Sequence, residues 1–168
     1  MPRTTTHITA ISGSPSARSR STALLQIALT RLESDGATQQ AVHVRDLPPA
    51  ALLFADTQAP QIREAVAAIE AADLVIVATP IYKAAYSGLL KTFLDLLRQD
   101  ALRGKTVLPL ATGGSAAHLL ALDYTLKSLP SCTSEVRIGG DTLSHESLSP
   151  RNSAAALARI TRSRSGCP

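Results

Sequence analysis

Short apolar runs alternate along the chain with longer amphipathic segments. The runs are rich in Val, Ile and Leu and too brief for helices, and the continuous run LVIVAT is typical of a strand buried on both faces. Between the runs, apolar residues recur at helical spacing, as in the series Leu24, Leu25, Ala28, Leu29 and Leu32. The pattern predicts strands over residues 7–12, 40–47, 74–79 and 106–111, and helices over residues 21–34, 61–72, 88–98 and 116–129.

Strands that alternate with helices predict an α/β fold with a doubly wound parallel sheet and helices on both faces. In such a sheet, ligands bind beyond the carboxyl ends of the strands. Three segments follow the first, third and fourth expected strands: SGSPSARSRS, TPIYKAAYSG and ATGGSAAH. We expect them to converge on one edge of the sheet and to form the functional site.

The first of these segments has the composition of an anion-binding loop. It lies at the N-terminus of an expected helix, where unpaired N–H groups and the helix dipole favour a phosphate. The chain contains neither GxGxxG nor GxxxxGK[ST], which excludes the dinucleotide fingerprint and the P-loop. A hydroxyl-rich phosphate loop without lysine remains, as a doubly wound flavin-binding sheet would use, and its candidates are Ser14, Arg18, Ser19 and Ser21. An ordinary turn followed by a helix N-cap would use the same residue types.

The other two segments also have features of a binding site. Tyr82, Lys83 and Tyr86 gather at the carboxyl end of a buried strand, which is unusual for a plain turn. In the third segment, Gly113 and Gly114 allow close approach of the backbone to a planar ligand, and Ser115 can cap the next helix. The alternative interpretation of each segment is structural: the chain leaves a strand and passes through an ordinary turn into a helix.

Length and composition favour a single domain and exclude several functional classes. The chain has 168 residues, no Trp, two Phe and three Tyr, so Leu, Ala, Val and Ile must build the core. Its net charge is +4, and no basic stretch is interleaved with aromatics, so we expect no nucleic-acid partner. No apolar run approaches the length of a membrane span, and Cys132 and Cys167 lack the spacing of a zinc site. We therefore expect a soluble cytoplasmic protein without a metal.

Three stretches carry a specific likeness to a known family. They are SGSP with the Ser/Arg-rich helix start after it, VATPIYKAAYSGLLKTFLDLL, and LRGKTVLPLATGGSAAHLLALDYTLK. They resemble the NADPH-dependent FMN reductases of the flavodoxin-like superfamily, most closely the sulfonate-utilisation branch that supplies an alkanesulfonate monooxygenase. The resemblance covers about residues 7–128. It implies a flavodoxin-like fold, FMN and NADPH as cofactors, and a flavin-dependent monooxygenase as the partner that accepts reduced FMN.

The same resemblance implies roles for individual residues. The segment after the third strand would contact the ring or ribityl atoms of the flavin through its backbone, and the TGGS loop would contact the isoalloxazine. These roles fall on Pro80, Ile81 and Tyr82, and on Thr112, Gly113, Gly114 and Ser115. Tyr124 is implied to lie in a π-type bulge at a tetramer interface, so a homo-oligomer, either a dimer or a tetramer, is expected. No catalytic residue is expected, because hydride transfer is the chemistry of the cofactors.

Two other functions remain open on the same fold. A flavodoxin-like electron carrier would hold FMN tightly and exchange single electrons without a pyridine nucleotide. Such carriers are typically acidic and clamp the ring with aromatics, which this sequence does not favour. A quinone or azo reductase differs from an FMN reductase only in the electron acceptor.

The pattern changes after Lys127. Residues 131–168 contain no aromatic residue and no long apolar run, and are rich in Ser and Arg. We divide the chain into a flavodoxin-like FMN- and NADPH-binding domain over residues 1–128 and an atypical C-terminal tail over residues 129–168 that has a low-complexity character. Natural divergence and a change of reading frame near codon 128 both account for such a tail. The fifth strand and the last helix of the expected sheet are in doubt for this reason.

Overall fold

The computed structural model describes residues 5–33, 37–113 and 137–138. In this part of the chain, the strands are β1 (His7–Ser12), β2 (Thr38–His43), β3 (Leu74–Tyr82), β4 (Ala85–Tyr86), β5 (Thr106–Thr112) and β6 (Arg137–Ile138). The helices are α1 (Arg20–Glu33), α2 (Pro49–Leu53), α3 (Pro60–Ala71) and α4 (Gly88–Leu94), with a 3₁₀ turn, η1, at Val44–Asp46. The expected helix over residues 116–129, which includes Tyr124, lies outside the described residues, as does the expected domain boundary at residue 128.

The strands form one sheet in the order β2-β1-β3-β5-β6, with β4 paired to β3 outside this series. The pairs within the series are all parallel. The chain moves from β1 outward to β2 and then returns to place β3 on the other side of β1. A topological switch point therefore lies between β1 and β3, as in a flavodoxin-like fold. This confirms the α/β doubly wound sheet that the sequence predicts.

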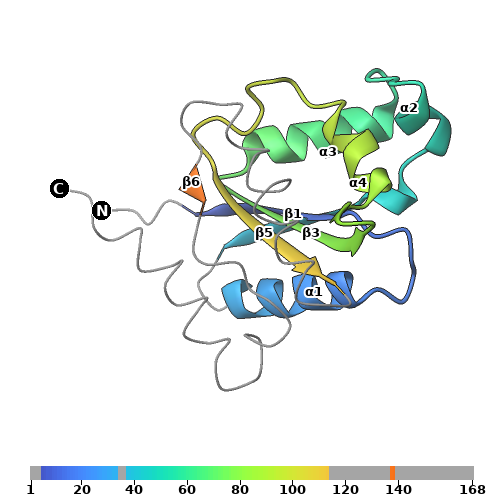
Figure 1. Cartoon of the computed structure of the whole chain (residues 1–168). Coiled ribbons are helices and arrows are strands. Elements are labelled where there is room, and N and C mark those ends of the chain that lie inside the picture. Colours follow the sequence, from blue (N-terminus) through green and yellow to red (C-terminus); the bar gives the residue numbers. More distant parts are fainter. Residues whose placement is uncertain (1–4, 34–36, 114–136, 139–168) are drawn as a thin grey trace.

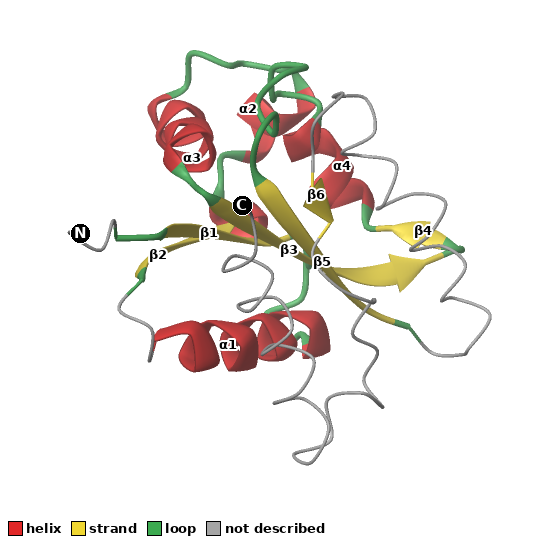
Figure 2. Cartoon of the chain, turned by 90° about the vertical axis from the view of Figure 1, so that its left-hand side faces the viewer, coloured by secondary structure: helices red, strands yellow, loops and turns green. Residues whose placement is uncertain are grey.

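Helices cover both faces of the sheet, with α1 on one face and α2, α3 and α4 on the other (Figure 1, Figure 2). Side chains alternate between the two faces along β3, which explains the two layers. Leu74, Ile76 and Ala78 belong to the core under α1. Val75 and Val77 belong to the core under α3 and α4. Within the described residues, no helix is long and apolar enough to cross a membrane.

The bounds of several elements differ from the sequence prediction. The expected strand over residues 40–47 ends at His43 and turns into η1, because its partner β1 ends opposite it, with Ser12 paired to His43. The Pro-rich segment expected as a loop contains α2, whose first residue is Pro49. The helix expected over residues 88–98 ends at Leu94, where the N–H of Leu97 bonds to the Leu94 carbonyl in a tighter turn.

The fifth parallel strand, for which the sequence offers no long apolar run, is β6. It pairs with the first two residues of β5, Thr106 with Arg137 and Val107 with Ile138. Among the described residues, the remainder of β5 has β3 as its only strand partner.

Candidate functional site

The ends of β1, β3 and β5 meet at one edge of the sheet. The register places Ser12, the last residue of β1, level with Ala78, and Pro80 level with Thr112, the last residue of β5. The N–H of Gly13 donates to the Ala78 carbonyl (2.8 Å), so the segment after β1 leaves the sheet directly beside β3. The three segments that the sequence identifies thus begin next to one another, at the switch point where open α/β sheets bind ligands.

The segment between β1 and α1 leads into a capped helix start. Ser19 occupies the N-cap position of α1, where its hydroxyl oxygen accepts from the N–H of Thr22 (3.3 Å) and its carbonyl accepts from the N–H of Ala23 (3.0 Å). The Ser19 hydroxyl also bonds to that of Ser21 (2.9 Å). These bonds fix the first turn of α1, which is the end of the helix that favours an anion.

Two of the phosphate-binding candidates have buried side chains. Ser14 is 1% exposed, and its hydroxyl oxygen accepts from the N–H of Ser16 (3.2 Å). Ser21 is fully buried beside Ser19. In this structure, the hydroxyls of Ser14 and Ser21 therefore shape the loop from inside, and Arg18 is the exposed candidate with a charge.

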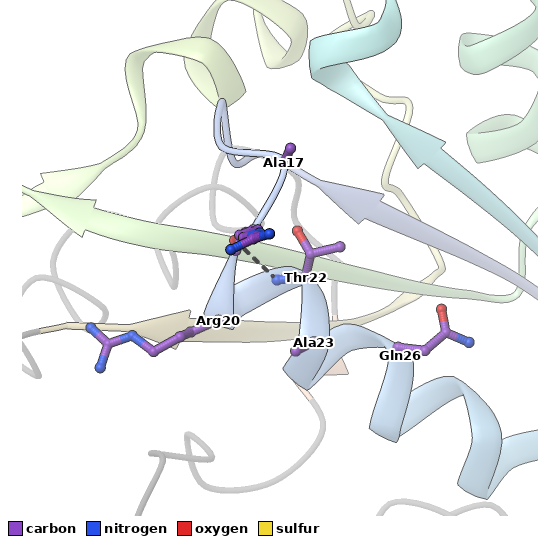
Figure 3. Close-up of a pocket in the computed structure, with 7 residues that line it drawn as sticks. Ala17, Arg20, Thr22, Ala23 and Gln26 are labelled. Atoms are coloured by element: carbon purple, nitrogen blue, oxygen red, sulfur yellow. Dashed lines mark hydrogen bonds between the residues drawn. The ribbon is translucent and has the colours of Figure 1, made fainter.

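An open depression of about 560 Å³ lies at the N-terminus of α1 (Figure 3). It is lined by Ala17, Arg18, Ser19, Arg20, Thr22, Ala23 and Gln26. None of these residues is acidic and two are arginines, so the lining is positively charged. Figure 3 shows the Arg20 side chain extending away from Thr22 and Gln26.

The segment after β3 is a hairpin, which corrects the expected loop. β3 continues past Thr79 through Pro80 and Ile81 to Tyr82, and then pairs antiparallel with β4, Ile81 with Tyr86 and Tyr82 with Ala85. Proline is disfavoured inside a central strand, because it lacks the N–H that a neighbouring strand needs. β1 pairs with β3 only as far as Ala78, so on that side Pro80 has no β1 residue beside it and is tolerated. Pro80, Ile81 and Tyr82 are therefore held by a sheet rather than by a loop.

The turn of this hairpin has an unusual backbone. Lys83 and Ala84 both have positive φ angles, 50° and 60°, as in the type I′ turn that glycine and asparagine normally occupy. A residue other than glycine in this region costs on the order of 1–3 kcal/mol, and such strain clusters at ligand sites. The turn presents Tyr82, whose side chain is half exposed, next to the ends of β3 and β5.

The third segment is described only where it begins. Thr112 is buried and Gly113 is exposed directly after β5, at the level of Pro80. Gly114 and Ser115 lie outside the described residues. The structure thus brings together the starts of all three predicted segments.

The sequence interpretation missed two polar residues at this edge, Thr79 and Ser87. Both are buried, and Ser87 caps α4 by accepting from the N–H of Leu90 (3.1 Å). A serine directly before an amphipathic helix is a recognisable N-cap signal, so Ser87 was within reach of sequence analysis. The contact of Ser87 with Gly13 could not be found in this way, because the two residues are far apart in the sequence.

The strand order and the helix start at the switch point define a flavodoxin-like α/β protein with a candidate phosphate site. The chain belongs to the NADPH-dependent FMN reductase family, whose model matches residues 6–143. This match extends past residue 128, where the resemblance noted from sequence ends.

Individual relatives agree with this assignment. The chain is 49% identical over 117 residues to an FMN reductase (NADPH) of Escherichia coli K12, which covers 70% of this chain and 61% of that protein. It is 33% identical over 161 residues to the NADH-dependent FMN reductase SfnE of Pseudomonas putida, which covers 93% of this chain and 87% of that protein. The chain thus spans about 61% of the length of its E. coli relative.

A solved structure supports the fold. The apo form of an NADH:FMN oxidoreductase, EMOB, superposes with a TM-score of 0.81 at 41% sequence identity, over 92% of this chain and 86% of that chain. At 19% identity, the flavoenzyme FerB of Paracoccus denitrificans shares the fold, with a TM-score of 0.69 over 92% of this chain and 93% of that chain.

Proposed function

We propose that this chain reduces FMN with a hydride from NAD(P)H and releases the reduced flavin to a flavin-dependent monooxygenase of sulfonate metabolism. The observation that carries this proposal is the helix start suited to a phosphate, which stands beside the ends of β3 and β5 at the switch point. FMN is an extended molecule with a phosphate at one end and a planar ring at the other. The site offers a place for each end.

In this proposal, each segment of the site has a separate task. Ser14, Arg18, Ser19 and Ser21 form the phosphate loop. Pro80, Ile81 and Tyr82 contact the ring or the ribityl chain, and the segment that comprises Thr112, Gly113, Gly114 and Ser115 approaches the isoalloxazine. The two cofactors carry the hydride chemistry, so the protein needs to bind and orient them and requires no acid–base residue.

The names of the two relatives differ in the nucleotide that donates the hydride. The E. coli relative is an NADPH enzyme by name, whereas SfnE is named for NADH. We propose NADPH as the preferred donor, in line with the family model. We also propose a cytoplasmic homo-oligomer, a dimer or a tetramer, which light scattering after gel filtration measures directly.

Oxidation of NADPH and NADH, followed with FMN, FAD and a quinone as acceptors, tests the reaction. We expect the purified protein to oxidise NADPH only when free flavin is added, with FMN preferred. FMN that stays bound through gel filtration, without turnover of NADPH or NADH, would identify an electron carrier instead. Faster turnover with the quinone than with FMN would identify a quinone reductase.

A further inference from the structure

Two buried hydroxyls connect the hairpin after β3 with the phosphate loop. The N–H of Ser87 donates to the Thr79 hydroxyl oxygen (3.1 Å), and the Ser87 hydroxyl donates to the Gly13 carbonyl. Thr79 is fully buried and Ser87 is 1% exposed. Residues 74 positions apart are thus joined by a bond that water does not reach.

The bond to Gly13 fixes the direction of the next peptide group. The peptide between Gly13 and Ser14 is trans, because the described residues contain no cis peptide bond. In a trans peptide, the C=O and the N–H point in opposite directions. Since the Gly13 carbonyl points at Ser87, the N–H of Ser14 points away from Ser87 and α4.

This N–H has no acceptor among the described residues. Ser14 itself is 1% exposed, and a buried backbone N–H normally has a partner. Its position in the loop after β1 makes an anion oxygen a suitable acceptor.

We propose that Ser87 is a positioning residue for the phosphate of FMN. By holding the Gly13 carbonyl, it aims the Ser14 N–H at the phosphate and does not touch the ligand itself. The proposal rests on the proposed function, because it requires FMN to bind with its phosphate in this loop. It adds Ser87 and Thr79, which lie outside the loop, to the residues that determine selectivity for FMN over flavins without a phosphate.

Thr79 extends the same connection toward the other end of the site. Its hydroxyl accepts from the Ser87 N–H and donates to the Pro80 carbonyl (3.0 Å). Thr79 therefore links Ser87 to the segment proposed to contact the flavin ring. The phosphate end and the ring end of the site share one hydrogen-bonded support.

The test compares FMN with riboflavin, which lacks the phosphate, in fluorescence titrations of the wild type and of Ser87→Ala. We expect the Kd for FMN to rise about tenfold and the Kd for riboflavin to rise less than twofold. Without the Ser87 hydroxyl, the Ser14 N–H is no longer held toward the phosphate, and its hydrogen bond to that charged group weakens. In steady-state assays, the KM for FMN should rise while kcat at saturating FMN stays near the wild-type value. Ser87→Thr retains the hydroxyl donor and should restore the preference for FMN.

Thr92→Val is the matched control. It removes a hydroxyl from within α4, one that donates to the Leu89 carbonyl (2.8 Å) of the same helix. We expect this variant to leave the ratio of the two Kd values unchanged. If Ser87→Ala does not fold, Thr79→Val, which removes the acceptor for the Ser87 N–H, is measured in the same way and should lower the preference for FMN.

Suppose that Ser87→Ala, or Thr79→Val where it replaces that variant, loses as much affinity for riboflavin as for FMN. This result would overturn the positioning role of Ser87 and leave the proposed function intact. A wild-type protein that binds neither flavin would overturn both.

Discussion

Gly13 and Leu90 are packed so closely that no side chain fits at Gly13. A Cβ atom placed on Gly13 would lie 2.6 Å from the Cβ of Leu90, a distance that real Cβ atoms essentially never show. Leu90 is fully buried and belongs to α4, whose cap residue Ser87 donates to the Gly13 carbonyl. The segment after β1, which is the proposed phosphate loop, is therefore held against α4 both by a hydrogen bond and by direct contact.

Gly13→Ala should separate α4 from the phosphate loop. Because the Cβ of Leu90 is fixed to its helix backbone, the clash requires a backbone shift, and we expect a loss of about 1–3 kcal/mol in the free energy of unfolding. FMN affinity should fall as well. Gly88→Ala is the control, since an added Cβ there meets nothing within 4 Å. Urea unfolding measures both variants, and equal stability of the two would contradict the close packing.

Arg18→Gln should weaken FMN and spare riboflavin. Arg18 is exposed in the lining of the depression at the start of α1, and the proposed function gives it the phosphate as a partner. Loss of a charge-assisted bond corresponds to about 1.5–3 kcal/mol of binding free energy. The dependence of the Kd for FMN on salt should become shallower too.

Arg63→Gln provides the comparison for Arg18, because it removes another exposed arginine, this one from α3 on the other face of the sheet. We expect its Kd for FMN to match that of the wild type. If both variants lost affinity alike, the effect would come from net charge and the local role of Arg18 would be wrong.

The sequence predicts the parts of this fold that local pattern determines. The bounds of β1 agree with prediction at both ends, and α1 is displaced by one residue. The end of β3 was not predictable in this way, because the pairing of Ile81 with Tyr86 depends on a turn whose residues, Lys83 and Ala84, are poor formers of that turn.

The candidate site shows the same division between local and long-range signals. Ser19 acts as an N-cap just before α1, as its place in the sequence suggests. The bond from Ser87 to Gly13 joins two segments that only the completed sheet brings together, so no local sequence pattern predicts it. The ligand roles of the site residues stay predictions until binding is measured.

Ala55→Gly should stabilise the protein. Ala55 follows α2 with a φ of 54°, in the left-handed region that favours glycine, and the N–H of Asp56 bonds back to the Ala51 carbonyl (2.9 Å). Removing the Cβ should raise the free energy of unfolding by up to about 1 kcal/mol. Ala50→Gly, inside α2, should lower it by a similar amount. Thermal unfolding of the pair checks the sign of each change.

Tyr86 should contribute to loss of stability at alkaline pH. Burial raises the pKa of Tyr86 above its usual value of 10.0, an effect that nearby Lys91 partly offsets. Because the folded state holds this proton more tightly than the unfolded state, stability is fully present below pH 10 and is lost as the pH rises through the folded pKa. In urea unfolding between pH 8 and about 11, Tyr86→Phe should show a shallower decline than the wild type. An unchanged slope would show that the phenol titrates alike in both states.

Limited proteolysis tests the boundary expected near residue 128. The apolar pattern ends after Lys127, and the only later pairing among the described residues joins Arg137 and Ile138 to the first two residues of β5. A pairing of two residues offers few backbone hydrogen bonds to set against the entropy of ordering the chain that leads to them. We therefore expect trypsin to leave a core that ends at Lys127, as identified by mass spectrometry of the intact fragment. A resistant fragment that retains Arg137 and Ile138 would show instead that β6 is an integral strand of the sheet and that the boundary lies beyond it.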